Sequence, residues 1–184
     1  MIRGKEEMKG MVGKEYTVKD IEALPAGQRA ELIDGQMYMM ASPERIHQQI
    51  LGKLYRMIAD YIDEKDGVCE VNLAPLAVYI NDDGRNYVEP DIFVVCDRDK
   101  LDAKGCHGAP DWVIEIVSPN SEKMDRKIKL FKYRTAGVRE YWIVDPEKEI
   151  VEVYHFERDL EKEYSFREHV PVGIYEGFEI VIYV

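Results

Sequence analysis

The sequence is poor in cysteine and has no long apolar run. Its three cysteines, Cys69, Cys96 and Cys106, lie far apart, form no Cys-x-x-Cys pair and leave an odd count, which argues against a disulfide framework and against a cysteine-based zinc site. We therefore expect a reducing, cytoplasmic environment. The longest apolar stretches, such as residues 73–80 and 92–96, are far shorter than the roughly 20 residues of a membrane-spanning helix. No membrane partner is expected.

The sequence also contains fewer basic than acidic residues. Lysine and arginine total 25 against 36 aspartate and glutamate residues, which gives a formal net charge of −11. A molecule with this charge repels nucleic acid at long range, which counts against a general DNA-binding role. Any site for a polyanion must then be local, formed by a basic patch or bridged by a divalent cation.

No internal repeat, low-complexity tract or Pro/Gly/Ser-rich linker divides the chain after its first residues. A chain of 184 residues is one ordinary domain that buries roughly two thirds of the surface exposed by its unfolded form. Residues 1–15 carry charges of both signs but lack the continuous apolar core of a secretory signal. We expect them to form a flexible leader before a single domain of residues 16–184.

Local patterns predict a mixture of helices and strands. Capping signals and apolar residues at three- and four-residue spacing predict helices over residues 18–23, 43–63 and 122–136. Short apolar runs bounded by turn residues predict strands over residues 68–71, 76–80, 87–96, 112–117, 140–144, 150–156 and 178–184. Asp34-Gly35 between two apolar runs indicates a tight hairpin. The mixture predicts an α/β fold, with a mixed β-sheet core flanked by helices and β-hairpin additions.

Each of the two most apolar predicted strands carries one acid, Asp91 in the first and Glu115 in the second. An ionised carboxylate removed from water costs several kcal/mol unless a cation or good hydrogen bonds compensate it. A divalent cation between two facing carboxylates turns their repulsion into binding, through the oxygen ligands that Mg²⁺ and Mn²⁺ prefer. Alternatively, Asp91 caps a strand end and Glu115 pairs with an arginine in the core. Together the two acids favour a metal.

The helix predicted after the second of these strands is locally basic. Its cations outnumber its acids by four, and they are Lys123, Arg126, Lys127, Lys129, Lys132 and Arg134. A solvated helix face explains most such runs, but Lys129 sits at the edge of the buried stripe. With about 3.3 Å per strand residue and 1.5 Å per helix residue, Lys129 lies level with Glu115 if the helix folds back along the strand.

Several other residues of these segments also have a plain structural reading. Asp125 lies four residues before Lys129 and can simply form an ion pair with it. Tyr133 either holds Lys129 or a phosphate, or packs as an ordinary tyrosine. His47 lies on a largely apolar helix face, where a hydrogen-bonded core histidine is the simpler reading than a catalytic one. Tyr141 and its neighbour Trp142 fit a core strand.

Several of these motifs together resemble one known family. They are Glu31-Leu32-Ile33-Asp34-Gly35, Ser42-Pro43 with His47, Glu89-Pro90-Asp91, Glu115-Ile116-Val117-Ser118-Pro119, Asp125 with Lys129 and Tyr133, and the run from Gly137 to Pro146. In this order they resemble the Uma-two family of restriction-endonuclease-like proteins, over about residues 17–156. The resemblance places the chain in the PD-(D/E)XK nuclease superfamily and implies a restriction-endonuclease-like fold.

The resemblance also implies roles for individual residues. Asp91 matches the PD element and Glu115 the following acid, both metal ligands, while Glu31 matches an acid that completes or orients the site. Val117 occupies the position where the superfamily pattern E-x-K expects lysine. The family supplies its lysine from the helix, which is here Lys129.

We therefore expect a metal-dependent endonuclease that hydrolyses the phosphodiester bonds of nucleic acid, with DNA as the expected substrate. The expected catalytic residues are Glu31, Asp91, Glu115 and Lys129. Mg²⁺ or Mn²⁺ would be held by Asp91, Glu115 and the backbone carbonyl of Ile116. Apolar strands near the C-terminus suggest a homodimer, which suits the cutting of two strands. The alternatives are a catalytically inactive nuclease-fold protein acting as a binding or assembly module, and hydrolysis of another phosphoester.

Overall fold

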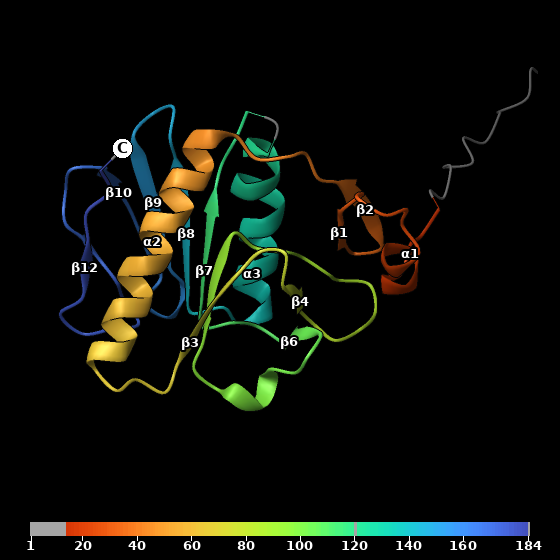
Figure 1. Cartoon of the computed structure of the whole chain (residues 1–184), viewed down its shortest axis with the longest axis horizontal. Helices are drawn as coiled ribbons and strands as arrows, with labels where there is room; N and C mark the ends of the chain where they lie inside the picture. The colour runs from red at the N-terminus through yellow and green to blue at the C-terminus, as the bar shows by residue number, and fades with distance from the viewer. Residues whose placement is uncertain (1–13, 120, 184) are drawn as a thin grey trace, which may run out of the picture.

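A central mixed β-sheet with helices on both faces forms the core of the computed structural model, which describes residues 14–119 and 121–183 (Figure 1). The spatial order of the six strands is β10-β9-β8-β7-β5-β3. Their bounds are β3 (Glu70–Leu73), β5 (Ile92–Val95), β7 (Trp112–Ile116), β8 (Glu140–Asp145), β9 (Ile150–His155) and β10 (Leu160–Ser165). Only β7 and β8 are parallel among the paired strands of this sheet. The predicted α/β fold with a mixed sheet is confirmed.

Two helical segments cover the two faces of this sheet (Figure 1). α2 (Arg45–Glu64) packs a buried stripe of Ile50, Leu54, Ile58 and Ile62 against one face. η2 (Met124–Lys129) and α3 (Leu130–Ala136) cover the other face and form the crossover that a parallel β7–β8 pair requires. None of the helices in the described residues combines the length and apolar character of a membrane span.

Side chains alternate across β7, and this alternation aims Glu115 at one face. Trp112, Ile114 and Ile116 pack on the α2 side of the sheet, while Val113 packs on the side of η2 and α3. Because successive strand residues point to opposite faces, Glu115 points toward η2 and α3. The sheet thus directs the acid at the basic helix.

Smaller elements surround the sheet. They are α1 (Val18–Glu22), the hairpin of β1 (Ala30–Ile33) and β2 (Gln36–Met39), the parallel pair of β4 (Ala77–Tyr79) and β6 (Gly105–His107), the pair of β11 (Val170–Pro171) and β12 (Glu179–Ile180), and the 3₁₀ turns η1 (Arg98–Lys100) and η3 (Phe156–Arg158). Thr17 caps α1, as predicted. The predicted hairpin at Asp34-Gly35 is confirmed, and both residues adopt the positive φ that a tight turn of this kind needs.

Several predicted bounds change in the structure. The strand predicted over residues 87–96 shortens to β5, because Pro90 lacks the N–H that a sheet ladder needs. Residues 76–80 contribute β4 to a small separate sheet, and the strand predicted over residues 178–184 shortens to β12, with Val184 outside the described residues. β10 was not predicted, because an edge strand of mostly exposed, charged residues lacks a clear apolar alternation. Residues 1–13 of the expected leader lie outside the described residues.

The expectation that the cysteines form no disulfide is wrong. Cys69 and Cys96 are bonded to each other, and Cys106 is free and buried. The antiparallel register pairs Glu70 with Val95, so the next pair outward brings the two cysteines opposite each other. Sequence spacing does not reveal this pairing, because it depends on which strands are neighbours.

Candidate functional site

An open cavity of about 790 Å³ lies where the strand ends of β5 and β7 meet the start of α2 and the helix η2. The segment after β2 and the loop after β7 complete its wall. Acidic side chains dominate its polar lining: Glu31, Glu44, Glu89, Asp91, Glu115, Asp125 and Glu147. Two cations, Arg29 and Lys129, also line it. All four predicted catalytic side chains therefore lie at one cavity.

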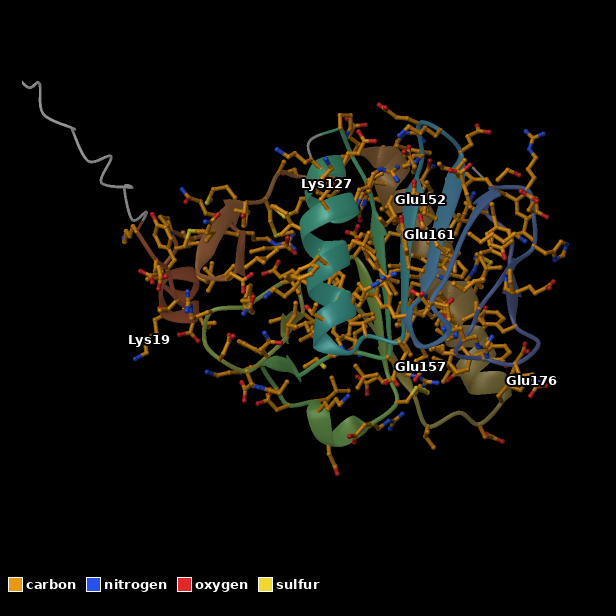
Figure 2. The ribbon with its side chains drawn as sticks, turned by 180° about the vertical axis from the view of Figure 1, so that it is seen from behind. Lys19, Lys127, Glu152, Glu157, Glu161 and Glu176 are labelled. Atoms are coloured by element: carbon orange, nitrogen blue, oxygen red, sulfur yellow. A yellow bond between two sulfur atoms is a disulfide. The ribbon has the colours of Figure 1, made fainter. Side chains whose placement is uncertain are left out.

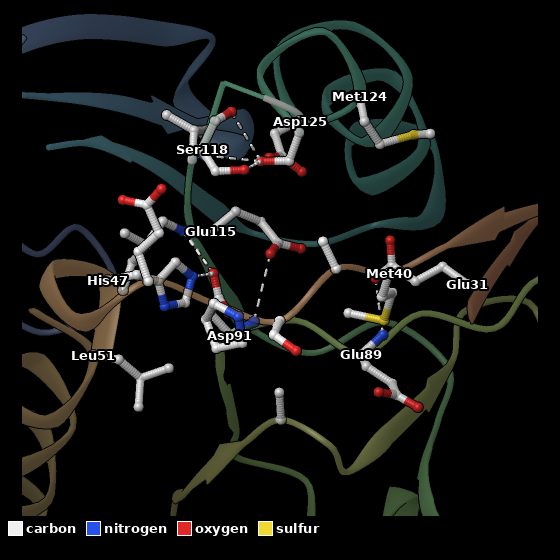
Figure 3. Close-up of a pocket in the computed structure, with 18 of the residues that line it drawn as sticks. Glu31, Met40, His47, Leu51, Glu89, Asp91, Glu115, Ser118, Met124 and Asp125 are labelled. Atoms are coloured by element: carbon white, nitrogen blue, oxygen red, sulfur yellow. Dashed lines mark hydrogen bonds and ion pairs between the residues drawn. The ribbon is translucent and has the colours of Figure 1, made fainter. Parts of the chain in front are cut away.

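Asp91 and Glu115 lie opposite each other across the ends of β5 and β7, and both line this cavity (Figure 3). Oδ2 of Asp91 accepts a hydrogen bond of 2.8 Å from the backbone N–H of Ile116 and lies 3.0 Å from Nε2 of His47. The backbone N–H of Asp91 lies 3.5 Å from Oε2 of Glu115. Asp91 thus ties two strands together, as the capping alternative expects, and also reaches the cavity.

Lys129 lies beside Glu115, as the rise per residue of helix and strand predicted. Its Nζ is 2.9 Å from Oε1 of Glu115, 2.8 Å from Oε2 of Glu31 and 3.5 Å from Oδ1 of Asp125. The lysine is only 4% exposed, so this ammonium is the counter-charge of three buried acids. The core partner of Glu115 is therefore a lysine, and the alternative of an arginine partner is wrong.

The helix that supplies Lys129 differs from the expected α-helix over residues 122–136. Residues 122 and 123 are α-helical, η2 is π-helical, and α3 continues as an α-helix to the left-handed cap at Gly137. Wider π-helical winding is rare and occurs often at functional sites. Here it carries both Asp125 and Lys129 with their side chains buried against the sheet.

The acid cluster carries more negative charge than its lysine neutralises. Burial raises the pKa of Glu115 well above its usual value; Lys129 opposes this rise, and the charges of Asp125, Asp91 and Glu31 add to it. Burial alone would lower the pKa of Lys129, but attraction by the acids outweighs it and holds the pKa above the ordinary range. The lysine thus stays charged, while Glu115 favours taking up a proton or a further cation.

Asp125 adds a second sign of unmet negative charge. Burial raises its pKa, against the opposing effect of Lys129. Within the described residues, its Oδ1 is buried and accepts no hydrogen bond, although the ammonium of Lys129 lies 3.5 Å away. The predicted pairing of Asp125 with Lys129 is therefore present but long.

Tyr133 and Tyr141 are both fully buried, yet they donate to different groups. The hydroxyl of Tyr133 donates to Oε1 of Glu115 at 2.9 Å, and burial raises its pKa well above the usual value. The hydroxyl of Tyr141 donates to the backbone carbonyl of Asp125 at 3.2 Å. Tyr133 is thus a packed tyrosine that also contacts the acid site, while Tyr141 and Trp142 are core residues, as predicted.

His47 lies at the edge of the cavity on the first turns of α2, and it is not a core residue. Its side chain is 13% exposed and its Nε2 contacts Asp91. The prediction of a hydrogen bond for His47 is confirmed, whereas its predicted place in the core is wrong and its partner was not predicted. α2 and β5 are distant in sequence, so the apolar pattern of the helix around His47 does not predict this contact.

Glu31 belongs to the site through two contacts. Its Oε2 pairs with Lys129, and its Oε1 accepts the backbone N–H of Glu89 at 3.0 Å. Glu89 in turn pairs with Arg29 and accepts the hydroxyl of Tyr87. No role was predicted for Glu89 or Arg29 from the sequence. The two-residue spacing between Glu89 and Asp91 was the available signal, since it places both on one strand face.

Most cations of the basic helix are used inside the fold. Arg126 pairs with Glu122, Asp145 and Glu152, Lys132 pairs with Asp34, and Arg134 lies 3.7 Å from Asp159. Within the described chain, no ion pair involves the exposed residues Lys123 and Lys127. Figure 2 views the molecule from the side of this helix and marks Lys127 on it. The solvated-face reading therefore holds for these two lysines.

The residues at the cavity fit a hard divalent cation. In the described part of the chain, no three His, Cys, Asp or Glu side chains form a ready-made metal cage. Mg²⁺ needs no such cage, because proteins usually hold it through one or two carboxylates together with waters and substrate phosphates. Asp91 and Glu115 provide two carboxylates, and the excess negative charge around them favours a cation.

Comparison with known proteins identifies the family. The sequence model of Uma2, described as "Putative restriction endonuclease", matches residues 18–180. The chain belongs to the Uma2 family. This confirms the resemblance found in the motifs and supports a nuclease-like function for a chain with a restriction-endonuclease-like fold.

Two further proteins resemble this Uma2 chain. An uncharacterized protein of Synechocystis sp. (strain ATCC 27184 / PCC 6803 / Kazusa) is 28% identical over 130 residues, which cover 70% of this chain and 66% of that protein. The chain thus spans just under two thirds of that relative. A crystal structure of "a putative nuclease belonging to DUF820" from Anabaena variabilis ATCC 29413 has a TM-score of 0.70 and 23% identity, covering 86% of this chain and 89% of the other. At that identity the likeness concerns the fold.

Proposed function

We propose that this Uma2 protein is a metal-dependent endonuclease that hydrolyses phosphodiester bonds of nucleic acid, with DNA as the expected substrate. One observation carries the proposal. Asp91 and Glu115 meet at the ends of neighbouring strands in an open cavity, and the Nζ of Lys129 lies 2.9 Å from Glu115. The family description supports nuclease chemistry, and the acid cluster supports the metal.

Each site residue has a chemical task in this proposal. Asp91, Glu115 and the carbonyl of Ile116 would hold Mg²⁺ or Mn²⁺, which supplies Lewis-acid chemistry at the scissile phosphate. Glu31 holds Lys129 and the segment before Asp91 in place. Because its pKa is raised, Lys129 keeps its charge and does not act as a base. It would instead offset the negative charge that builds on the phosphate.

Further parts of the proposal concern assembly and location. We infer a homodimer, because cutting both strands of a duplex takes two sites, and a cytoplasmic location, where nucleic acid is available and where the bond between Cys69 and Cys96 would be open to reduction. Sedimentation of the purified chain tests the first. A monomer that nicks single strands would contradict the dimer and leave the chemistry of the site in place.

The experiment that tests the activity compares Glu115→Gln with the parent on supercoiled plasmid in Mg²⁺ and in excess EDTA. Removing the charge of a metal ligand should lower the nicking rate by roughly 100-fold or more, with an unchanged circular dichroism spectrum. Glu147→Gln is the matched control, because Glu147 also lines the cavity but lies on its exposed rim. Nicking by Glu115→Gln at the parent rate would show that the assignment is wrong.

A catalytically inactive nuclease-fold protein acting as a binding or assembly module is the second candidate. It is favoured by the three carboxylates that already neutralise Lys129 and by the net charge of −11. Calorimetric titration with Mn²⁺ separates the two candidates. A degenerate site shows no Mn²⁺ binding that depends on Asp91 and Glu115, whereas a nuclease site does.

A further inference from the structure

The Asp91 carboxylate is held through only one of its two oxygens. Oδ2 receives the backbone N–H of Ile116 at 2.8 Å and the Nε2 of His47 at 3.0 Å. Two donors fill the two lone pairs of a carboxylate oxygen. In the described residues no hydrogen bond or ion pair reaches Oδ1, and this oxygen is not among the buried unpartnered atoms. Oδ1 therefore faces the cavity that Asp91 lines.

The Glu115 carboxylate also has two donors on one oxygen and at most a weak contact on the other. Oε1 receives Nζ of Lys129 at 2.9 Å and the hydroxyl of Tyr133 at 2.9 Å. The contact to Oε2 is the N–H of Asp91 at 3.5 Å, a length at which a hydrogen bond is weak. Each acid thus has one saturated oxygen and one nearly free oxygen.

The tautomer of His47 follows from the same contact. If Nε2 carried no proton, its lone pair would face the lone pairs of Asp91 Oδ2 at 3.0 Å, which is repulsive. The proton is therefore assigned to Nε2, which donates. Nδ1 is buried and has no hydrogen-bond partner among the described residues. The ring orientation therefore depends on the hydrogen bond from Nε2 to Asp91.

We infer that His47 and Tyr133 are positioning residues that decide which carboxylate oxygens the site offers to a divalent cation. Each fills a lone pair on one oxygen, so that Asp91 Oδ1 and Glu115 Oε2 are presented to the ion. The inference rests on the proposed metal site and goes beyond it, because neither His47 nor Tyr133 is among the proposed ligands of the ion. Groups that orient metal ligands in this way commonly change metal affinity by 10–100-fold when removed.

Tyr133→Phe tests this for Glu115. The change removes one hydroxyl and keeps the buried ring, and we expect the dissociation constant for Mn²⁺, measured by calorimetry on the full chain, to rise by about tenfold or more. Tyr141→Phe is the matched control. It removes a hydroxyl that is equally buried and lies on a ring 5.0 Å from that of Tyr133, but donates to a backbone carbonyl. Its Mn²⁺ affinity should equal that of the parent.

A pair of variants tests the same point for Asp91. His47→Leu removes the donor and should weaken Mn²⁺ binding by about tenfold. His47→Gln places an amide N–H near the position of Nε2 and should restore most of the affinity. A merely structural role for His47 would not give this rescue, because leucine suits an apolar helix face better than glutamine does.

The outcomes separate this inference from the proposed function. If the parent binds Mn²⁺ but does not nick DNA, the proposed function is wrong. The positioning roles are then still tested by the Mn²⁺ affinities of the Tyr133 and His47 variants. If the parent binds and nicks, and Tyr133→Phe and His47→Leu bind Mn²⁺ as the parent does, the positioning roles are wrong. They are also wrong if the parent binds no Mn²⁺, or if Tyr141→Phe weakens binding as much as Tyr133→Phe.

Discussion

Replacing Lys129 by methionine should destabilise this protein strongly at neutral pH. Methionine has a similar length and leaves Glu31, Glu115 and Asp125 without their shared counter-charge. The two shortest contacts are 2.8 Å and 2.9 Å, and each is worth about 6 kcal/mol of attraction at an effective dielectric constant of 20. The cost of burying the ammonium offsets much of this, so the net loss should be about 3–5 kcal/mol.

The loss should depend on pH with a definite sign. Without Lys129, the pKa values of Glu115 and Asp125, which burial already raises, should rise further above those of the unfolded chain. Between the unfolded and folded values the folded state binds more protons, so the stability of the variant falls as pH rises. The difference in unfolding free energy between Lys129→Met and the parent should be largest at about pH 8 and should decrease toward about pH 5.

Urea denaturation followed by circular dichroism measures this directly, and a thermal scan should show a melting temperature roughly 6–20 °C lower at about pH 8. Lys127→Met is the matched control, because Lys127 is exposed on the same helix and makes no ion pair within the described residues. Its stability should lie within about 0.5 kcal/mol of the parent. Equal stability of Lys129→Met and parent at about pH 8 would refute the reasoning.

Two further predictions concern the buried acid Glu115 and the disulfide between Cys69 and Cys96. Because burial raises the pKa of Glu115, protons compete with metal there, and Mn²⁺ affinity should be higher at about pH 8 than at about pH 6; an affinity independent of pH would contradict a buried acid as ligand. The disulfide between Cys69 and Cys96 closes a separation of 27 residues, so its reduction should cost about 3–4 kcal/mol of stability. The denatured, unreduced chain should show one reactive thiol, Cys106, whereas three would show that the bond does not form.

The parts of the fold that local patterns specify were predicted well. α2 follows from its apolar periodicity, and the β1–β2 hairpin follows from Asp34-Gly35. The level of Lys129 beside Glu115 was predicted from the rise of an α-helix and of a strand, on the condition that the helix folds back along the strand. These features depend on short-range geometry, which the sequence displays directly.

The parts that depend on neighbours distant in the chain were not predicted. The bond between Cys69 and Cys96 arises because β3 and β5 are adjacent, and the contact of His47 with Asp91 arises because the start of α2 lies beside the residue that precedes β5. The π-helical winding of η2 leaves the same apolar spacing as an α-helix over so short a stretch. Each of these outcomes is set by the assembled sheet and not by the residues alone.

The charges of the cavity link metal and nucleic acid in the proposed reaction. Among the residues that the structure describes, seven lining carboxylates face two lining cations, and both cations are already paired, Arg29 with Glu89 and Lys129 with three acids. An incoming phosphate therefore meets net repulsion, because the lining acids outnumber these two cations. A divalent cation held by Asp91 and Glu115 adds positive charge where the phosphate would lie. Metal and nucleic acid should thus each strengthen the binding of the other, in a cavity that by itself repels the substrate.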